Sequence, residues 1–197
     1  MPDAWISRGW PVILLSAVAF AGDYALTVWG ARLYRNSGAK DILQYEGSYE
    51  LTPYYQADIE SGRWFSRRFV LALLVSAGLL TVLWWITVGT GLWPMLFAVG
   101  VGSVLLREVP VYLRHVQNIS FFRHVGDLRV APGSHIEYPR GLIYRLSATD
   151  MAVMAMAWLV LAALLESWFF LGGAIGSASV ALTHIRQSRR HRPPEGP

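Results

Sequence analysis

Residues 69–88 read FVLALLVSAGLLTVLWWITV, and none of them is charged. A helix crosses the hydrocarbon core of a membrane with about 20 mostly apolar residues, which is the length of this stretch. Of all 197 residues, 54% are hydrophobic and only 15% are charged. A soluble domain of this size has too little interior to bury so many apolar side chains, and a disordered chain would have the opposite composition. The sequence therefore predicts an integral membrane protein.

Four other segments have the length and hydropathy of membrane spans, although two of them carry charges. Asp23 lies inside the first, and the third reaches Arg107 and Glu108 before it ends. We therefore expect an all-α integral membrane protein, a five-span helical bundle with a single transmembrane domain over residues 1–187. A basic, proline-rich tail over residues 188–197 is expected to be disordered. The spans are predicted at about residues 10–31, 69–88, 92–110, 148–165 and 168–184.

Basic residues indicate the orientation, because short loops rich in Lys and Arg stay in the cytoplasm. With five crossings, the loops after spans one and three and the tail lie on one side, and every basic residue except Arg8 lies there or near that face. Tryptophan, which favours the membrane interface, agrees. We predict a multi-pass protein of the cell membrane with its N-terminus outside and its C-terminus in the cytoplasm. The tryptophans expected outside are Trp10, Trp84, Trp85, Trp93 and Trp168, and those expected near the inner face are Trp29 and Trp64.

The first span contains a sequence that resembles a signal-peptidase site, Ala19 to Ala21. Cleavage there would leave a strongly basic loop outside the cell. It would also discard half of an apolar segment that continues to Ala31. We therefore expect the first span to be retained.

The loop after span one is rich in tyrosine and carboxylates. Thr52 and Pro53 are typical of a helix start and Gly62 of a helix end, so we expect a short helix on the cytoplasmic membrane surface. Glu46 and Glu50 are four residues apart and would share a helical face, where they could hold a hard cation. Carboxylates on a wet loop are usually solvated, and we predict no metal here.

The loop after span three is also expected to lie against the membrane on the cytoplasmic side. Residues 111–125 carry apolar side chains with helical spacing, which predicts an interfacial helix that continues from span three. Residues 130–136 contain a Pro-Gly turn between β-prone runs, which favours a small hairpin. Ser147 and Asp150 fit a capping box that opens span four.

Some kinds of site are excluded by residues that the chain lacks. Without cysteine it has no disulfide, iron–sulfur cluster, zinc–thiolate site or cysteine nucleophile. It has no Walker loop, HExxH motif, nucleophile elbow or dinucleotide fingerprint, so an ATPase or a standard hydrolase is not expected. The spacing of His115, His124 and His135 matches no compact zinc site. We predict neither a metal nor a cofactor, and no binding of nucleic acid.

Asp23 requires an explanation, because a charge within lipid is costly and usually has a partner inside the bundle. At about 1.5 Å per residue, Asp23 lies roughly 20 Å below Trp10, and Arg107 lies roughly 21 Å below Trp93. Both tryptophans are expected at the outer face, so the two charges reach the same depth. We predict an intramembrane polar pair between Asp23 and Arg107, with Glu108 directed elsewhere, toward headgroups or a cytoplasmic arginine.

The sequence leaves two interpretations of this pair open. In the favoured one it is a structural lock that satisfies two charges and fixes the helix register. In the other it is a proton or ion relay, which requires Asp23 to reach water. Asp23, Thr27 and Gly30 share a helical face that is expected to pack against span three. Thr27, Glu50 and Glu108 form the candidate secondary polar site.

Span five carries small residues at a spacing that allows close helix packing. Gly172 is four residues from Gly176, and Gly173 is four residues from Ser177. These positions are predicted to contact another helix. That helix is either span four of the same chain or belongs to a second copy, and the spacing does not distinguish the two.

Two short motifs stand in the N-terminal third of the chain: Asp23-x-x-Leu26-Thr27-x-x-Gly30 and, downstream, Glu50-Leu51-Thr52-Pro53. Together they resemble a pattern in uncharacterised small polytopic membrane proteins of bacteria and archaea. Asparagine often stands in those proteins where Thr52 stands here. The resemblance implies no activity, and it singles out Asp23 and Glu50 as the first residues to mutate.

Three classes of function follow from these observations. The expected one is a non-enzymatic membrane scaffold or accessory subunit, whose cytoplasmic surface binds anionic lipid headgroups, a protein partner or a second copy of the chain. The alternative is a small transporter or channel that uses Asp23, although the chain shows no internal repeat. The third is an intramembrane enzyme that acts on lipids, with Asp23, Glu50 or a loop histidine as general base. This last class requires a carboxylate and a histidine to converge in a cavity.

Overall fold

The computed structural model describes residues 5–46, 55–91, 93–125 and 134–191. Five of its helices are long and apolar enough to cross a membrane, which confirms the predicted number of spans. Many large apolar side chains lie exposed on their surfaces, such as Leu79 and Leu164 at 66% and 73%, as expected for side chains that face lipid. The helices are α1 (Trp10–Asn36), α4 (Arg67–Trp84) with its π-helical continuation η2 (Trp85–Gly89), α5 (Pro94–His124), α6 (Arg140–Leu165) and α7 (Trp168–Arg190).

Short elements lie outside the five long helices, and three of them were not expected. The helix predicted to end at Gly62 is α3, which ends at Glu60, and Gly62 follows with the positive φ of 67° that favours glycine. Its predicted start, at Thr52 and Pro53, lies outside the described residues. The short elements are η1 (Ile6–Arg8), α2 (Ala39–Ile42), β1 (Leu43–Tyr45), α3 (Gln56–Glu60) and β2 (Ile136–Tyr138).

Strand β2 pairs with β1 in parallel, with Leu43 opposite Ile136 and Tyr45 opposite Tyr138. The predicted hairpin is therefore wrong at Ile136, because the partner of this strand comes from the loop after the first span. The rest of the expected hairpin, residues 130–133, lies outside the described residues. A β-prone run shows that a strand can form, but its pattern does not show which distant segment completes the ladder.

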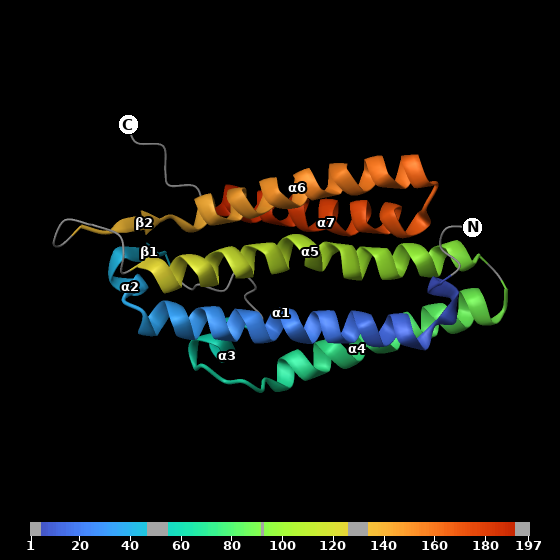
Figure 1. Cartoon of the computed structure of the whole chain (residues 1–197), viewed down its shortest axis with the longest axis horizontal. Helices are drawn as coiled ribbons and strands as arrows, with labels where there is room; N and C mark the ends of the chain where they lie inside the picture. Colours follow the sequence, from blue (N-terminus) through green and yellow to red (C-terminus); the bar gives the residue numbers. More distant parts are fainter. Residues whose placement is uncertain (1–4, 47–54, 92, 126–133, 192–197) are drawn as a thin grey trace.

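The five long helices run side by side. Figure 1 shows α6 and α7 as a hairpin next to α5, with α1 and α4 on the other side of α5. Helices α1, α5 and α7 finish at the end where α6 begins and where the two strands lie. We call this the basic end, because the helix termini there carry Arg35, Arg123, Arg140 and Arg190. The opposite end is the tryptophan end, where the helix termini carry Trp10, Trp84, Trp85, Trp93 and Trp168.

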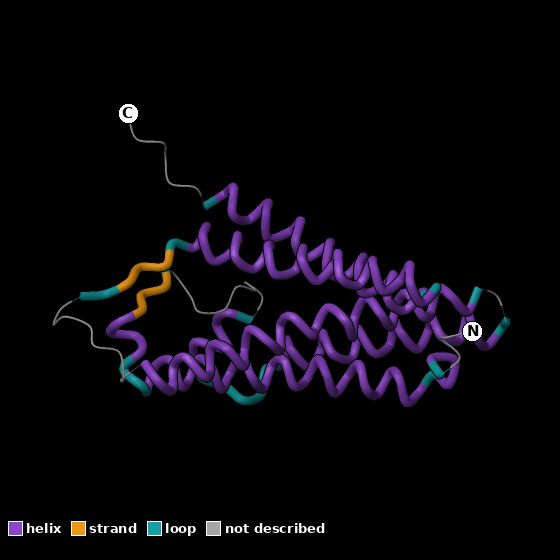
Figure 2. The backbone as a smooth tube through the Cα atoms, turned by 45° about the horizontal axis from the view of Figure 1, so that its top comes forward, coloured by secondary structure: helices purple, strands orange, loops and turns teal. Residues whose placement is uncertain are grey.

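The α6–α7 hairpin is not parallel to the rest of the bundle. Figure 2 shows that it lies close to the other helices toward the tryptophan end and diverges from them toward the basic end. Glycines explain the close approach: Gly172 of α7 lies against the carbonyl of Val99, and Gly102 of α5 lies against the carbonyl of Phe169. A Cβ on either glycine would overlap the facing backbone. Close packing therefore requires glycine at these positions.

The small residues of α7 face α5, the third predicted span. Gly173 lies against the side chain of Leu106, Gly176 lies against the backbone of Ser103, and Ser177 is fully buried. From the sequence, only span four or a second copy of the chain was expected as the partner. The spacing of small residues predicts which face of a helix packs closely, but it carries no information on which helix packs against that face.

Two helices extend further than predicted on the basic side. Helix α1 continues to Asn36 instead of ending near residue 31. Helix α5 passes through Pro110 to His124, so the expected interfacial helix over residues 111–125 is the last part of the same helix. At about 1.5 Å per residue, α5 is roughly 45 Å long, longer than a hydrocarbon core of about 30 Å. Apolar character marks only the part of a helix that lies in lipid.

The predicted capping box of span four is wrong, because α6 begins at Arg140 and Ser147 and Asp150 lie inside it. The first turn is capped from another segment, since Oε2 of Glu46 accepts a hydrogen bond from the backbone N–H of Arg140 (2.9 Å). Helix α7 also continues to Arg190, so part of the segment expected to be disordered is helical. Its buried Ser188 donates to the carbonyl of Gly141 (2.9 Å).

Candidate functional site: a polar cavity between the membrane helices

A cavity of about 760 Å³ lies between α1 and α5 on one side and the α6–α7 hairpin on the other. Residues of α3, β1 and β2 complete its wall. These elements lie toward the end of the bundle at which the hairpin diverges (Figure 2). Seven aromatic and five charged residues line it. Its volume lies in the range of small-molecule sites, and its lining combines rings with a few polar groups, as such sites do.

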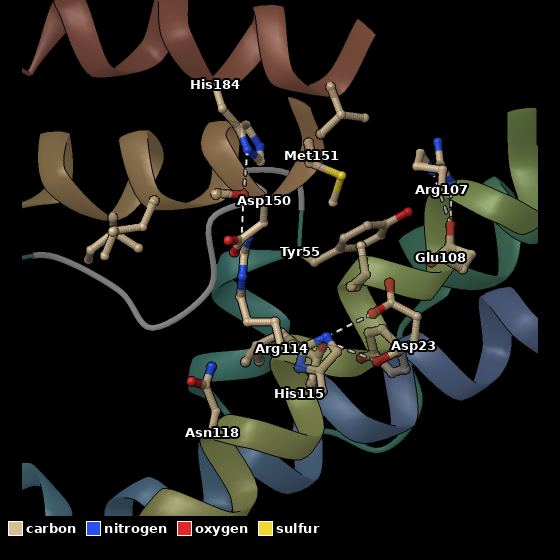
Figure 3. Close-up of a pocket in the computed structure, with 18 of the residues that line it drawn as sticks. Asp23, Tyr55, Arg107, Glu108, Arg114, His115, Asn118, Asp150, Met151 and His184 are labelled. Atoms are coloured by element: carbon tan, nitrogen blue, oxygen red, sulfur yellow. Dashed lines mark hydrogen bonds and ion pairs between the residues drawn. The ribbon is translucent and has the colours of Figure 1, made fainter. Parts of the chain in front are cut away.

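Asp23 lines this cavity from the middle of α1. Its Oδ1 lies 2.8 Å from Nε2 of His115 on α5. The same nitrogen lies 3.1 Å from Oγ1 of Thr27, one turn further along α1, and this hydroxyl donates to the carbonyl of Asp23 (2.9 Å). The side chains of Asp23 and His115 are 24% and 12% exposed. Asp23 and Thr27 thus meet the third span through His115 (Figure 3).

These contacts indicate which ring nitrogen of His115 carries a hydrogen. Thr27 uses its hydroxyl hydrogen for the carbonyl of Asp23, so Nε2 of His115 supplies the hydrogen for both of its own contacts. The other ring nitrogen, Nδ1, is buried and has no hydrogen-bond partner within the described part of the chain. These contacts therefore place a hydrogen on Nε2.

The structure gives Asp23 and Arg107 different partners from the predicted ones. Nη2 of Arg107 lies 2.5 Å from Oε1 of Glu108, and its Nε lies 3.1 Å from the same oxygen. Glu108, expected to face elsewhere, is buried and lines the same cavity as Asp23 and Arg107. The depth argument brought Asp23 and Arg107 into one cavity. Their predicted pairing is wrong, because Glu108, which was expected to be directed elsewhere, pairs with Arg107, and Asp23 meets His115, two turns beyond Arg107.

A second polar network joins α5 to α6 and α7. Arg114 donates from Nη2 to Oδ2 of Asp150 (2.7 Å) and from Nη1 to Oγ of Ser147 (2.5 Å). Ser147 is fully buried and lies 2.7 Å from Nδ1 of His184. The hydroxyl group of Ser147 thus connects the guanidinium group of Arg114 with the imidazole of His184. All four residues line the cavity, so the sequence motif read as a helix cap belongs to the site (Figure 3).

Aromatic rings form another part of the cavity wall. Tyr24 stacks on Phe69 with ring centroids 4.2 Å apart, and Tyr55 meets these two rings edge-on at 6.1 Å and 6.4 Å. Phe20, one turn before Tyr24, lies 5.4 Å from Phe69. All four residues line the cavity, and Figure 3 shows the ring of Tyr55 projecting into the same space as the carboxylate of Asp23.

The charges that line the cavity do not cancel. Arg107 is paired with Glu108 at 2.5 Å, and Arg114 is paired with Asp150 at 2.7 Å. The partner of Asp23 is the imidazole of His115 and not a guanidinium group. The lining therefore holds two guanidinium groups and three carboxyl groups, and Asp23 is the carboxylate that no arginine pairs with among them.

Of the predicted polar residues, Asp23, Thr27, Arg107 and Glu108 come together in one cavity. Glu50 lies outside the described residues. The small residues Gly172, Gly173, Gly176 and Ser177 do not line the cavity and serve the contact with α5.

Three residues of the site were not predicted from the sequence: Arg114, Ser147 and His184. His115 was considered only as a possible zinc ligand, and its spacing from the other histidines argued against that role. A signal was present on α5, where Glu108, His115 and Asn118 recur at helical spacing on one face of an otherwise apolar span. The other two loop histidines have separate partners. His124 contacts the carbonyl of Ser120 (2.8 Å), and His135 contacts Glu137 (3.2 Å).

The chain matches no protein-family model, no curated protein and no solved structure. The resemblance based on two short motifs therefore stays a prediction. The function is inferred from the geometry of the cavity.

Proposed function

We propose that this protein is an intramembrane enzyme that acts on the polar head of a membrane amphiphile, with Asp23 as general base. The observation that carries the proposal is the 2.8 Å hydrogen bond between Asp23 and His115 inside a cavity of about 760 Å³. A carboxylate and a histidine thus converge in a cavity, as this class of function requires. In this proposal the protein lies in the cell membrane with its basic end in the cytoplasm.

Asp23 is held in a geometry that suits a general base. Its Oδ1 accepts the N–H of His115, whereas its Oδ2 has no hydrogen-bond partner within the described residues. A hydroxyl group or a water molecule at Oδ2 would give its proton to the carboxylate as its oxygen bonds to an ester carbon or phosphorus atom of the head group. The bond from that atom to the leaving oxygen breaks, and the protonated Asp23 returns the proton to this oxygen, so that the step needs no oxidant or reductant. His115 acts as a positioning residue, because its N–H fixes the orientation of the carboxylate. Thr27 supports His115 at 3.1 Å.

The surface of the bundle supports a substrate that comes from the membrane. Phe121 on α5 and Leu146 on α6 line the cavity and are also 41% and 51% exposed. We propose that the cavity opens between these two helices, at the membrane interface. An acyl chain could remain in the membrane there while its head group enters the polar cavity.

A structural lock explains less of this geometry. Such a lock needs a dry contact in which both charged groups are satisfied. Asp23 instead lines a cavity, and one of its oxygens is left without a partner within the described residues. The scaffold function expected from the sequence would not require a cavity of this kind.

Transport is the second candidate, favoured by the position of Asp23 in a cavity halfway along α1. The glycines of α5 and α7 close the bundle toward the tryptophan end by backbone contact. A transporter would separate this contact in every cycle, whereas an enzyme needs access from one side only. We therefore rank the enzyme first.

The proposal is tested with the purified protein in nanodiscs made from the lipid extract of the expression host. Mass spectrometry follows the lipid composition over time. We expect the wild type to convert one lipid class and Asp23→Asn to be slower by at least about 100-fold, the loss typical of a missing general base. His115→Gln keeps an N–H donor near the position of Nε2, so we expect a smaller loss. The matched control is Glu137→Gln, which changes a carboxylate–histidine pair outside the cavity.

The possible results separate the candidate functions. Unchanged lipids with the wild type, or equal rates for Asp23→Asn and wild type, would contradict the enzyme. Movement of a solute into sealed vesicles without any change in the lipids would instead support transport. Loss of folded Asp23→Asn protein, with His115→Gln as active as the wild type, would support the lock.

A further inference from the structure

The lining of the cavity also indicates the chemistry of the head group. We propose that the ligand carries an ammonium group, bound between the carboxylate of Asp23 and the aromatic wall of Tyr24, Tyr55 and Phe69. The inference rests on the proposed function only for the idea that the ligand is a substrate. The binding site itself is argued from charge and rings.

The charge balance favours a cation over an anion. Each arginine of the lining is already paired, Arg107 with Glu108 and Arg114 with Asp150. An anionic head group would find each of these guanidinium groups already neutralised by a carboxylate and would also bring a second negative charge toward Asp23. An ammonium group would instead pair with Asp23, which neither arginine of the lining contacts, in a region between membrane helices where charges are weakly screened.

The aromatic wall favours an organic ammonium group over a small metal ion. Ring faces attract ammonium groups, and more strongly where water is excluded. Tyr24 and Phe69 form one stacked surface, and Tyr55 stands edge-on to both. A metal ion would need several oxygen or nitrogen ligands, and the described residues contain no group of three acidic or histidine side chains that could hold one. Aromatic rings together with one carboxylate are the side-chain groups that bind an organic ammonium ion.

The nearby arginines of α1 are directed away from this wall. Arg32 donates to the carbonyl of Gly62 and lies over the ring of Trp64, 4.4 Å from its centroid. Arg35 donates to the carbonyls of Ile59 and Glu60. These guanidinium groups are engaged by the C-terminal end of α3 and the residues after it. They do not line the cavity, so they do not neutralise Asp23 there.

The test measures binding apart from catalysis, by thermal unfolding of the full-length protein in a neutral detergent. The probes are tetramethylammonium chloride, short-chain phosphatidylcholine and short-chain phosphatidylglycerol, with potassium chloride as the salt control. We expect the two ammonium probes to raise the unfolding midpoint of the wild type in a saturable manner. Asp23→Asn and Tyr55→Leu should each weaken this binding by at least about tenfold. Glu137→Gln should bind like the wild type.

Each outcome is informative. Stabilisation by phosphatidylcholine alone identifies a lipid head group, stabilisation by tetramethylammonium alone identifies a free ammonium compound, and both show that the ammonium group suffices. Stabilisation by phosphatidylglycerol alone, or by no probe beyond the salt control, would overturn the inference.

If Tyr55→Leu does not fold, Phe20→Leu removes another ring of the same wall. Ammonium binding without lipid conversion would leave this inference standing and contradict the enzyme, whereas conversion of a lipid without an ammonium group would do the reverse.

Discussion

His115 shows at the residue scale how a carboxylate is held between membrane helices. Its Nε2 donates to Asp23 at 2.8 Å, while its Nδ1 stays buried. Removing the acceptor would leave the N–H of His115 largely buried without its carboxylate partner. An amide at position 23 would still accept this hydrogen bond through its oxygen. The two kinds of substitution should therefore differ in stability.

We expect Asp23→Ala to lower the free energy of unfolding by about 1.5–3 kcal/mol, the contribution of a hydrogen bond to a charged group, because the N–H of His115 then keeps only its contact with Thr27. Asp23→Asn should lower it by less than about 1 kcal/mol, because the hydrogen bond is kept. Equilibrium unfolding in mixed micelles measures both values. Glu137→Ala is the control, since Glu137 is 72% exposed in its pair with His135, and its effect should stay within about 0.5 kcal/mol. An Asp23→Ala protein as stable as the wild type would contradict this account of His115.

At this scale the sequence allowed Asp23 to be identified but not its partner. A single carboxylate in an apolar span stands out because burial of its charge is costly. The partner depends on helix tilt and rotation, which shift one span against another by whole turns. Arg107 stood at the calculated depth, yet its own neighbour Glu108 was the nearer acceptor.

At the scale of elements, the contact between α5 and α7 determines where the bundle is closed. The backbones approach so closely that a Cβ at Gly102 or Gly176 would overlap the facing helix. Gly78 on α4 offers a contrast, because a Cβ there would meet nothing within 4 Å. The same substitution should thus have opposite effects at these positions.

We expect Gly176→Ala and Gly102→Ala to destabilise the protein by about 1–3 kcal/mol, the cost of overpacking. Gly78→Ala should be neutral or stabilising by up to about 1 kcal/mol, because alanine is the better helix former. Unfolding in the same mixed micelles compares the three variants. Equal stability of Gly176→Ala and wild type would show that α5 and α7 are not in backbone contact.

The five long helices could be predicted from the sequence, but their ends and partners could not. Apolar composition identifies the part of a helix that lies in lipid, so α6 was expected to begin near residue 148 instead of at Arg140. The cap of α6 comes from Glu46, nearly a hundred residues earlier in the chain. Contacts between distant segments leave no local pattern that could reveal them.

At the scale of the whole molecule, basic and tryptophan-rich helix termini lie at opposite ends. We predict that the basic end faces the cytoplasm. The chain contains no cysteine, so single substitutions can be labelled without background. In intact cells a membrane-impermeant maleimide should label Thr90→Cys and should label Gln44→Cys and Gln187→Cys only after permeabilisation. Labelling of Gln44→Cys and Gln187→Cys on different sides of the membrane would contradict the five-span topology.

The cavity could not be predicted at this scale, although several of its residues could be. It exists because the α6–α7 hairpin is tightly packed at one end and diverges at the other (Figure 2). Small residues in span five indicated close packing, but the divergence depends on how all five helices fit together. The polar face of α5 could be predicted from the sequence, whereas the cavity beside that face could not.

The central claim, that Asp23 faces an accessible cavity, is tested most directly by cysteine accessibility in nanodiscs. Val111 lines the cavity on α5, whereas Val101 on the same helix is fully buried. We predict that a water-soluble methanethiosulfonate with a trimethylammonium group modifies Val111→Cys and leaves Val101→Cys unmodified. The sulfonate-bearing reagent should modify Val111→Cys more slowly. If Val111→Cys is as unreactive as Val101→Cys, Asp23 lies in a dry helix contact and the proposed site does not exist.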